Sequence, residues 1–214
     1  MKSTLVIHAF RLYTRHMNQT FIFIGRSGSG KGTQAELLMD YLKSKAPESQ
    51  IFYLESGQKF REFFAEDNFT TRLAEEIYNK GGLQPEFLAV WLWSSALVKN
   101  IKEDTTLVLD GTPRKLHEAH ILDSALKFYK RGKPSVIYIN VSRGWAYDRL
   151  KNRGRSDDVS ERDINKRLDW FDSDVVPALS FFRDNPDYNF YDIEGEQTIE
   201  KVHNEILFKL KSQQ

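Results

Sequence analysis

The feature that most constrains this chain is a glycine-rich loop that separates an apolar run from a helical pattern. The loop runs from Gly25 to Thr33 and reads GRSGSGKGT, with the spacing G-x-x-x-x-G-K that ends at Lys31. The apolar run 21–24 precedes it and a helical pattern over 34–43 follows it. Because strand, loop and helix occur in this order, the backbone N–H groups are expected to enclose a phosphate at the positive end of the helix. The alternative is a glycine-rich turn that happens to contain a lysine.

Two side chains of the loop have expected roles. Lys31 is placed to reach the outer phosphates of a nucleoside triphosphate. The residue after the lysine is Gly32, so the hydroxyl group that usually follows comes one position later, at Thr33. Thr33 is therefore the residue expected to assist a bound magnesium ion, because Gly32 has no side chain.

Composition narrows the class of protein. The chain has 214 residues, of which 40% are hydrophobic and 29% charged, as in a globular protein of one domain. Its formal net charge of +1 argues against a broadly basic nucleic-acid binder. It has no cysteine, which excludes disulfides, a thiol nucleophile and a cysteine zinc site. No apolar run approaches the roughly 20 residues that span a membrane.

The first 19 residues contain no acidic residue and carry basic ones, among them Lys2, Arg11 and Arg15. Such a segment is typical of a transit peptide, which would place the protein in an organelle. The alternatives are an extra strand or helix, or an extension upstream of a start at Met17. We take the cytoplasm as the simpler expectation.

Short apolar runs alternate with helical patterns along the rest of the chain. Strands are expected at 20–24, 51–54, 105–110, 134–140 and 189–193. Helices are expected at 34–43, 69–79, from 85 to about 101, up to about 129, at 143–153, from 161 towards 182 with a bend near Pro177, and at 199–210. This alternation predicts an α/β fold, with a five-stranded parallel sheet between two helical layers and right-handed crossovers.

Three polar segments come directly after predicted strands. They are the loop 25–33, the segment 55–61, interpreted as a loop before a helix, and the turn 110–114. In a parallel sheet the carboxyl ends of the strands lie at one edge, where ligands bind. The three segments are therefore expected to form one site.

Further motifs follow in order along the chain. They are Gly-Lys-Gly-Thr-Gln at 30–34, Ser-Gly-Gln-Lys-Phe-Arg at 56–61, Gly-Leu-Gln-Pro at 82–85, Asp-Gly-Thr-Pro-Arg at 110–114, and the arginines Arg149, Arg153, Arg155 and Arg167. With these motifs the chain resembles the adenylate kinase family of nucleoside monophosphate kinases, of the short-lid type, from residue 21 to about 210. This resemblance implies the phosphate-loop NTPase fold and the transfer of the γ-phosphate of Mg-ATP to a nucleoside monophosphate.

The resemblance also implies roles for individual residues. ATP would be bound by Gly25, Ser27, Gly28, Ser29, Gly30, Lys31, Gly32, Thr33 and Arg149, the last also against the base. The monophosphate would be bound by Ser56, Gly57, Arg61, Gly111, Arg114, Glu118, Arg155 and Arg167. The catalytic cations would be Lys31, Arg114, Arg149, Arg153, Arg155 and Arg167. Asp110 and Thr33 would hold Mg²⁺ through its waters.

Each of these residues also has a plainer interpretation. A single arginine on a helix is most often a solvated charge or the partner of a nearby acid. Asp110 could cap a turn, and Arg114 could pair with Glu118 at i, i+4 on a helix. It is their joint match to one set of motifs that favours the functional interpretation.

Departures from the family pattern fall near the expected acceptor pocket, at Gln58, Thr112 and Glu118. Glu118 stands where the family often has a glutamine that reads the acceptor base. AMP is the first expectation, and a short lid with Arg-Ser-Asp-Asp at 155–158 keeps a UMP/CMP-type kinase as the alternative. Two other hypotheses are a nucleotide-binding regulator that turns over poorly and a kinase for an alcohol acceptor. The second would need a carboxylate to accept a hydroxyl proton.

The expected organisation is an extension over 1–19 and one kinase domain over 20–214. Within it, a monophosphate-binding region at about 55–84 and a short lid at about 153–160 would close over the substrates. The lid has no cysteine or histidine, so it cannot carry the zinc of some longer family members. By resemblance we expect a monomer whose partners are small nucleotides, with no nucleic acid or membrane.

Overall fold

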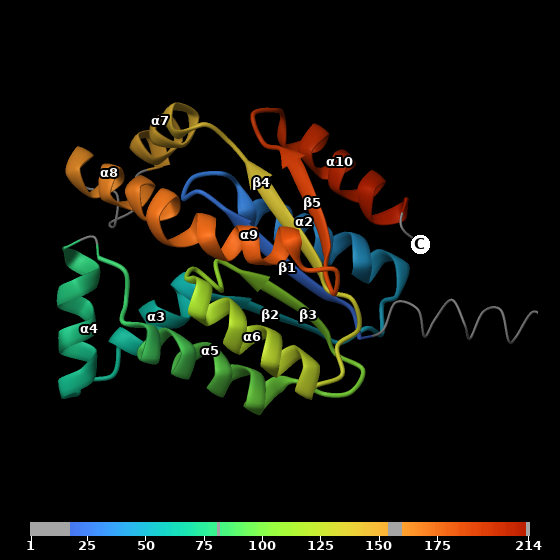
Figure 1. Ribbon diagram of the computed structural model, residues 1–214, viewed down its shortest axis with the longest axis horizontal. Helices are drawn as coiled ribbons and strands as arrows, with labels where there is room; N and C mark the ends of the chain where they lie inside the picture. Colours follow the sequence, from blue (N-terminus) through green and yellow to red (C-terminus); the bar gives the residue numbers. More distant parts are fainter. Residues whose placement is uncertain (1–17, 81, 154–159, 213–214) are drawn as a thin grey trace, which may run out of the picture.

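A computed structural model of the chain describes residues 18–80, 82–153 and 160–212 (Figure 1). Its centre is a five-stranded parallel sheet with the strand order β2-β3-β1-β4-β5. The strands are β1 (Thr20–Gly25), β2 (Ile51–Glu55), β3 (Thr106–Asp110), β4 (Ser135–Asn140) and β5 (Asn189–Glu194). The predicted fold class is confirmed.

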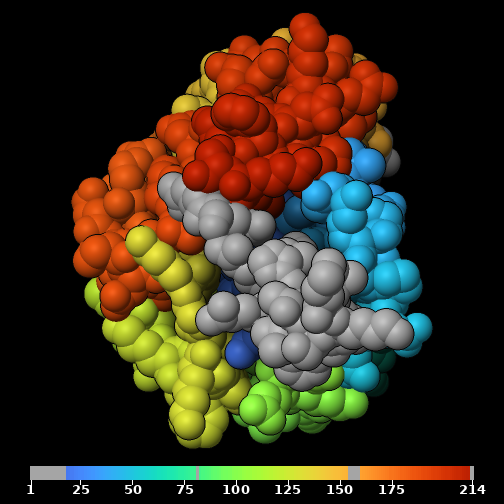
Figure 2. Space-filling model, turned by 90° about the vertical axis from the view of Figure 1, so that its right-hand side faces the viewer, coloured from blue at the N-terminus to red at the C-terminus, as the bar shows by residue number. Residues whose placement is uncertain are grey.

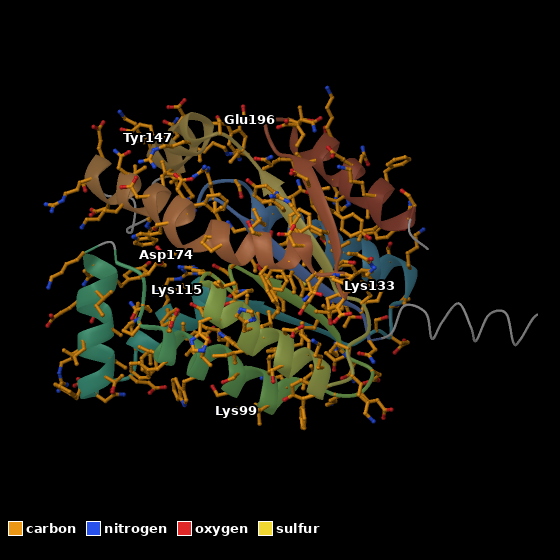
Figure 3. All side chains as sticks on the ribbon, in the orientation of Figure 1. Lys99, Lys115, Lys133, Tyr147, Asp174 and Glu196 are labelled. Carbon is orange, nitrogen blue, oxygen red and sulfur yellow. The ribbon has the colours of Figure 1, made fainter. Side chains whose placement is uncertain are left out.

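Helical segments connect the strands and cover both faces of the sheet. They are α2 (Lys31–Lys45), α3 (Ser56–Phe64), α4 (Phe69–Asn79), α5 (Glu86–Asn100), α6 (Leu116–Phe128), α7 (Arg143–Arg153), α8 (Glu161–Trp170), η1 (Phe171–Val175), α9 (Val176–Asp184) and α10 (Ile199–Lys211). Charged side chains such as Lys99 and Glu196 lie at the periphery of these layers (Figure 3). Within the described ranges, no helix combines the length and the apolar character that crossing a membrane requires.

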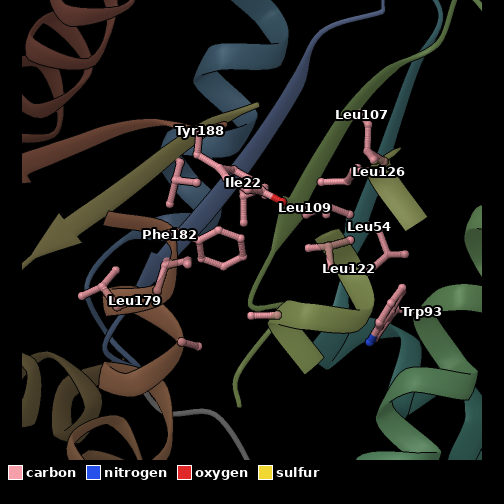
Figure 4. Close-up of a cluster of buried hydrophobic side chains, with 14 of the residues drawn as sticks. Ile22, Leu54, Trp93, Leu107, Leu109, Leu122, Leu126, Leu179, Phe182 and Tyr188 are labelled. Carbon is pink, nitrogen blue, oxygen red and sulfur yellow. The ribbon is translucent and has the colours of Figure 1, made fainter. Parts of the chain in front are cut away.

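Strand β1 is buried on both faces because a layer of helices packs against each face of the sheet. Phe21 and Phe23 pack with α2 and α10, whereas Ile22 and Ile24 face the layer of α5, α6 and α9. The second layer is shown in Figure 4, where Phe182 packs close to Ile22 against the sheet. A continuous apolar strand between two helical layers explains why the sequence run 21–24 does not alternate with polar residues.

The register of the strands sets which residues meet at the functional edge. Phe23 of β1 is opposite Asp110 of β3, and Glu55 of β2 is opposite the same Asp110. On the other side of β1, Gly25 is opposite Ile139. Three segments therefore begin side by side at the carboxyl edge of the sheet. They are the loop after β1, the start of α3 and the turn after β3.

The opposite edge of the sheet is held by a buried arginine. Arg131 is 6% exposed and donates hydrogen bonds to Thr20 Oγ1, Asn18 Oδ1 and the carbonyl oxygens of Gln19 and Thr105. Burial lowers its pKa to about 10. Figure 2 shows this side of the molecule, with α10 above and α2 to the right. The network fixes the start of β1 to the loop before β3.

The structure differs from the sequence-based expectation at three element boundaries. Helix α2 begins at Lys31 rather than at 34, so its first turn belongs to the loop. No loop separates β2 from α3, because the helix begins at Ser56 directly after the strand. The predicted long helix after residue 160 is present as one continuous helical run over 161–184, and its irregularity is the π-helical segment Phe171–Val175, which ends two residues before Pro177.

Helix α5 presents part of its apolar pattern to the surface. Trp93 and Leu97 are buried, but Phe87 and Val98 are 70% and 74% exposed and Trp91 is half exposed. The helix is apolar nearly all round, so helical spacing alone did not distinguish its core face. Trp91 packs edge-on against Phe63 of α3.

We expect Phe182→Ala to lower the free energy of unfolding by about 3 to 5 kcal/mol, because Phe182 is fully buried and its removal leaves a cavity between α9 and the sheet. Phe208→Ala is the matched control: this ring is 72% exposed on α10, and its loss should cost less than about 0.5 kcal/mol. Urea denaturation followed by circular dichroism measures both. Equal losses in the two variants would contradict this description of the core.

Candidate active site

The phosphate loop turns tightly between β1 and α2. The Ser29 amide donates to the Arg26 carbonyl oxygen at 3.1 Å, and Gly28 adopts a φ of 84°. A Cβ atom at Gly28 would lie 2.9 Å from the carbonyl oxygen of Ala146, so the close approach of α7 requires glycine there. Gly30, the residue before α2, supplies no side-chain cap. The first N–H groups of α2 thus face the loop, as anion binding requires.

Lys31 folds back on the loop that precedes it. Its Nζ donates to the carbonyl oxygens of Gly25, at 3.0 Å, and Arg26, at 2.9 Å. Burial lowers the pKa of Lys31 to about 8, and the nearby Asp110 carboxylate opposes part of that shift. A half-buried cation whose partners are neutral carbonyls would be stabilised by an anion in the loop.

Asp110 ends β3 beside the loop and is only 6% exposed. Its Oδ2 accepts a hydrogen bond from the Tyr53 hydroxyl at 3.2 Å, and burial raises the pKa of its carboxyl group. A Cβ atom on Gly32 would lie 3.4 Å from the same oxygen, so the start of α2 packs closely on Asp110. Thr33 is exposed one residue further along and lines the same cleft.

Arg114 is held on the other side of Asp110 by a short network. Its Nε donates to the Gly111 carbonyl oxygen at 3.0 Å, and its Nη2 donates to Ser56 Oγ at 3.2 Å. Ser56 Oγ in turn donates to the Gly111 oxygen at 2.8 Å. Burial lowers the pKa of Arg114. The network joins the start of α3 to the turn after β3, as the segment positions predicted.

These groups open into one cleft of about 800 Å³. Six of its lining side chains are basic: Lys31, Arg61, Arg114, Arg149, Arg153 and Arg167. Four are acidic: Glu36, Glu55, Asp110 and Asp148. The cations come from α2, α3, the turn after β3, α7 and α8, so elements distant in the sequence converge on one volume. The cleft suits a polyanion of several charges.

Arginines of α7 and α8 lie opposite the loop. The guanidinium of Arg149 stacks over the Trp145 ring at 4.5 Å, and both residues line the cleft. Arg167 is 8% exposed on α8. On the other side Arg61 pairs with Glu55 at 3.2 Å. A planar cation over an indole ring provides a surface on which an aromatic base could stack.

A second cavity, of about 20 Å³, shares Ser56, Gly111 and Arg114 with the cleft and contains Glu118. Glu118 is 3% exposed, and burial raises its pKa. Its Oε2 accepts from the backbone N–H of Arg114 at 3.4 Å, so a backbone contact takes the place of the i, i+4 side-chain pair that spacing allowed. Two other lining groups, Trp93 Nε1 and Gln84 Oε1, are buried without a partner among the described residues.

Most of the predicted site residues lie together. The cleft is lined by Ser27, Gly28, Gly30, Lys31, Gly32, Thr33, Ser56, Gly57, Arg61, Asp110, Gly111, Arg114, Arg149, Arg153 and Arg167. Gly25 and Ser29 complete the loop, with Ser29 buried. Arg155 and most of the predicted lid lie outside the described residues, as do residues 1–17.

Sequence reasoning missed several groups that the structure adds. Tyr53 and Glu55 face the cleft from β2, and Trp145 and Asp148 face it from α7. Trp93 of α5 is buried in the core and also lines the smaller cavity. The signal available for Tyr53 and Glu55 was their alternation at the carboxyl end of β2, where residues two apart point to the same side.

The residues present fit a magnesium ion that is bound mainly through substrate and water. No three His, Cys, Asp or Glu residues of the described chain are grouped closely enough to hold a metal by themselves. Asp110 offers one buried carboxylate and Thr33 one hydroxyl at the edge of the phosphate loop. Mg²⁺ on nucleotide phosphates typically takes only one or two protein oxygens and keeps several waters.

Comparison with known proteins gives consistent matches. The sequence profile for adenylate kinase matches residues 23–186. Adenylate kinase 1 of Nostoc sp. is 30% identical over 191 residues, which are 89% of this chain and 98% of that protein. The adenylate kinase of Helicobacter pylori is 30% identical over 191 residues, covering 89% of this chain and 95% of that protein.

The lowered pKa of Lys31 predicts how a triphosphate binds as pH changes. The free lysine is charged below about pH 8 and neutral above it, whereas a bound polyphosphate favours the charged form. Binding above that pH takes up a proton, so affinity for ATP should fall by up to about tenfold per pH unit from there. Isothermal titration across this range measures it. Lys31→Met should bind weakly with no such dependence, and an equal pH dependence in that variant would contradict the assignment.

Proposed function

This chain belongs to the adenylate kinase family of phosphotransferases, and from that premise we propose that it transfers the γ-phosphate of Mg-ATP to AMP, giving two ADP. The observation that carries the proposal is the single cleft where basic side chains surround the phosphate loop. They reach it from both sides, with Lys31 at the loop and Arg114 at the turn after β3. Such a cleft suits two phosphorylated substrates rather than one.

The proposed reaction forms one bond and breaks one bond at the γ-phosphorus, and it requires no proton transfer. An oxygen of the AMP phosphate forms a bond to the γ-phosphorus, and the bond from that phosphorus to the β–γ bridging oxygen breaks. The attacking oxygen is already ionised, so no general base is needed. The protein must align two anions and neutralise their charge.

We assign the roles of the residues from the family resemblance, and for the described residues their place in the cleft supports it. Lys31 and the loop N–H groups would hold the ATP phosphates, and Arg149 would lie against the adenine of ATP. Arg61 and Arg114 would grip the monophosphate, each with a planar guanidinium that matches two oxygens. Arg153, Arg155 and Arg167 would surround the transferring group.

Asp110 and Thr33 would orient the waters of the magnesium ion. When bound, Mg²⁺ supplies charge neutralisation between the β- and γ-phosphates. The buried position of Asp110 beside the loop supports this assignment. Because every group in the proposed site comes from one chain, we propose that a monomer suffices.

We propose that the acceptor base binds beside Arg114 at the smaller cavity, which must widen to admit it, because about 20 Å³ holds little more than a water molecule. Its Glu118 can accept a hydrogen bond from the exocyclic amine of adenine, and also from that of cytosine, so a CMP kinase is the second candidate. When protonated, Glu118 could both accept from the amine and donate to the ring nitrogen beside it. The raised pKa of Glu118 favours that form.

We expect turnover with Mg-ATP and AMP in a coupled assay of ADP release. AMP, CMP, UMP, GMP, dCMP and dTMP are tested one at a time, with Lys31→Met as the control that should lose activity by at least about 100-fold. A preference for CMP would assign the alternative acceptor. If no monophosphate supported turnover while ATP still bound, the chain would instead be a nucleotide-binding homologue of low activity.

Glu118 provides a sharper test of the base. The KM for AMP should rise with pH, because an ionised carboxylate places a negative oxygen beside the lone pair of adenine N1. Glu118→Gln should lower the KM for AMP and remove this pH dependence, while the KM for ATP stays within about twofold. A preference for GMP that is lost in Glu118→Gln would contradict the AMP proposal, since guanine offers two donors to an ionised carboxylate.

A further inference from the structure

Arg26 lies in the phosphate loop, but its side chain points away from Lys31. Its carbonyl oxygen accepts from Lys31 Nζ at 2.9 Å and from the Ser29 amide at 3.1 Å. Its guanidinium crosses to another part of the fold, where Nη2 donates to Asp172 Oδ1 at 2.7 Å. One residue therefore connects the loop to η1, a segment 146 positions away in sequence.

The guanidinium is held on three sides. Nε donates to the Val141 carbonyl oxygen at 3.3 Å, and the group lies over the Phe171 ring at 4.4 Å from its centre. Phe171 is buried and stacks on Tyr138 of β4. The Arg26 side chain is 15% exposed, so its ion pair with Asp172 is partly shielded from water.

The π-helical geometry of η1 presents two adjacent residues to Arg26. Val176 donates its N–H to the Phe171 carbonyl oxygen, an i to i−5 bond that widens the turn. As a result Phe171 and Asp172 both contact the guanidinium, one through its ring and the other through its carboxylate. Single π-turns within helices frequently occur at functional positions.

A second arginine extends the link to α7. Arg143 pairs with Asp169 at 2.8 Å and with Asp172 at 3.5 Å, and it donates to the backbone and side-chain oxygens of Asn165. The start of α7, the end of α8 and η1 are thus joined to the loop through Asp172. These two helices carry Arg149, Arg153 and Arg167, which line the cleft opposite Lys31.

We propose that the Arg26–Asp172 pair is a latch that sets the distance between the phosphate loop and the arginines of α7 and α8. Both members are positioning residues, because neither lines the cleft. Asp172 lies five positions after Arg167, and the Arg26 backbone holds Lys31, so the pair fixes two groups on opposite sides of the transferring phosphate. The proposal rests on the proposed function, in which Lys31 and Arg167 contact the phosphate from opposite sides.

The test compares Asp172→Ala with Asp169→Ala. Asp169 is the matched control, since it pairs with Arg143 from the same exposed side of the helix but does not contact Arg26. Asp172→Ala should lower kcat about tenfold while the KM for both nucleotides stays within about twofold, because misplacement by about 1 Å impairs the transfer step rather than binding. Asp169→Ala should keep kcat within about twofold.

A double-mutant cycle identifies the partner. Arg26→Ala combined with Asp172→Ala should be no slower than either single variant if the two residues act only through each other. Three results would overturn the latch. The first is a double variant whose loss of kcat is the product of the two single losses. The others are an equal loss of kcat in Asp172→Ala and Asp169→Ala, and an unchanged kcat in Asp172→Ala. Should Asp172→Ala not fold, Asp172→Asn gives the same test, since it keeps the size of the side chain and removes the charge that pairs with Arg26.

Amide hydrogen exchange tests the latch without turnover. Asp172→Ala should speed exchange at the loop 25–31 by at least about threefold relative to the wild type, and Asp169→Ala should leave it unchanged. If the wild-type protein phosphorylated no monophosphate, the proposed function would fail while this measurement still decided the latch. Unchanged loop exchange in Asp172→Ala would overturn it.

Discussion

The parallel pairing of β1, β2 and β3 is the constraint on which the site depends. It places Phe23 and Glu55 opposite the same Asp110, so the chain leaves three strands at one level. The segments that follow these strands carry Lys31, Arg61 and Arg114, and α7 and α8 supply the remaining cations of the cleft. The site depends on this register, because a shift of β1 along β3 would move the loop relative to Asp110 and Arg114.

Burial at the carboxyl edge of the sheet raises the free energy of the charged side chains that lie there. Burial lowers the pKa of Lys31 and of Arg114 and raises that of Asp110, so all three charged forms are disfavoured by their surroundings. The six cations of the cleft outnumber its four acidic side chains, so an excess of positive charge remains. An empty cleft of this composition is electrostatically strained, and a bound polyanion would relieve that strain. Part of the affinity for nucleotide thus has its origin in the cost of the free site.

The sequence predicted the local elements and the sheet edge at which they meet, but not the contacts that depend on detailed packing. The loop, the strands and the motif at 110–114 could be read because glycine spacing and apolar runs act over a few residues. Helices 69–79 and 143–153 were predicted to their final residues. The direct passage from β2 into α3 and the π-turn at 171–175 depend on packing, which no spacing encodes. Tyr53 on Asp110 and Trp93 in the smaller cavity likewise follow from pairing across the sheet and between helices.

The position of Arg26 shows how the proposed phosphate loop can also carry a structural link. In the proposed function the loop would contact its anion with backbone N–H groups and with Lys31, so the side chain of its second residue would not be required there. That side chain leaves the loop on the far side and reaches the only helical segment of the described chain with π geometry. The backbone of one residue thus organises the lysine while its side chain organises the opposing helices. In the proposed function, a displacement of Arg26 would therefore change the position of Lys31 and of the opposing arginines relative to the transferring phosphate.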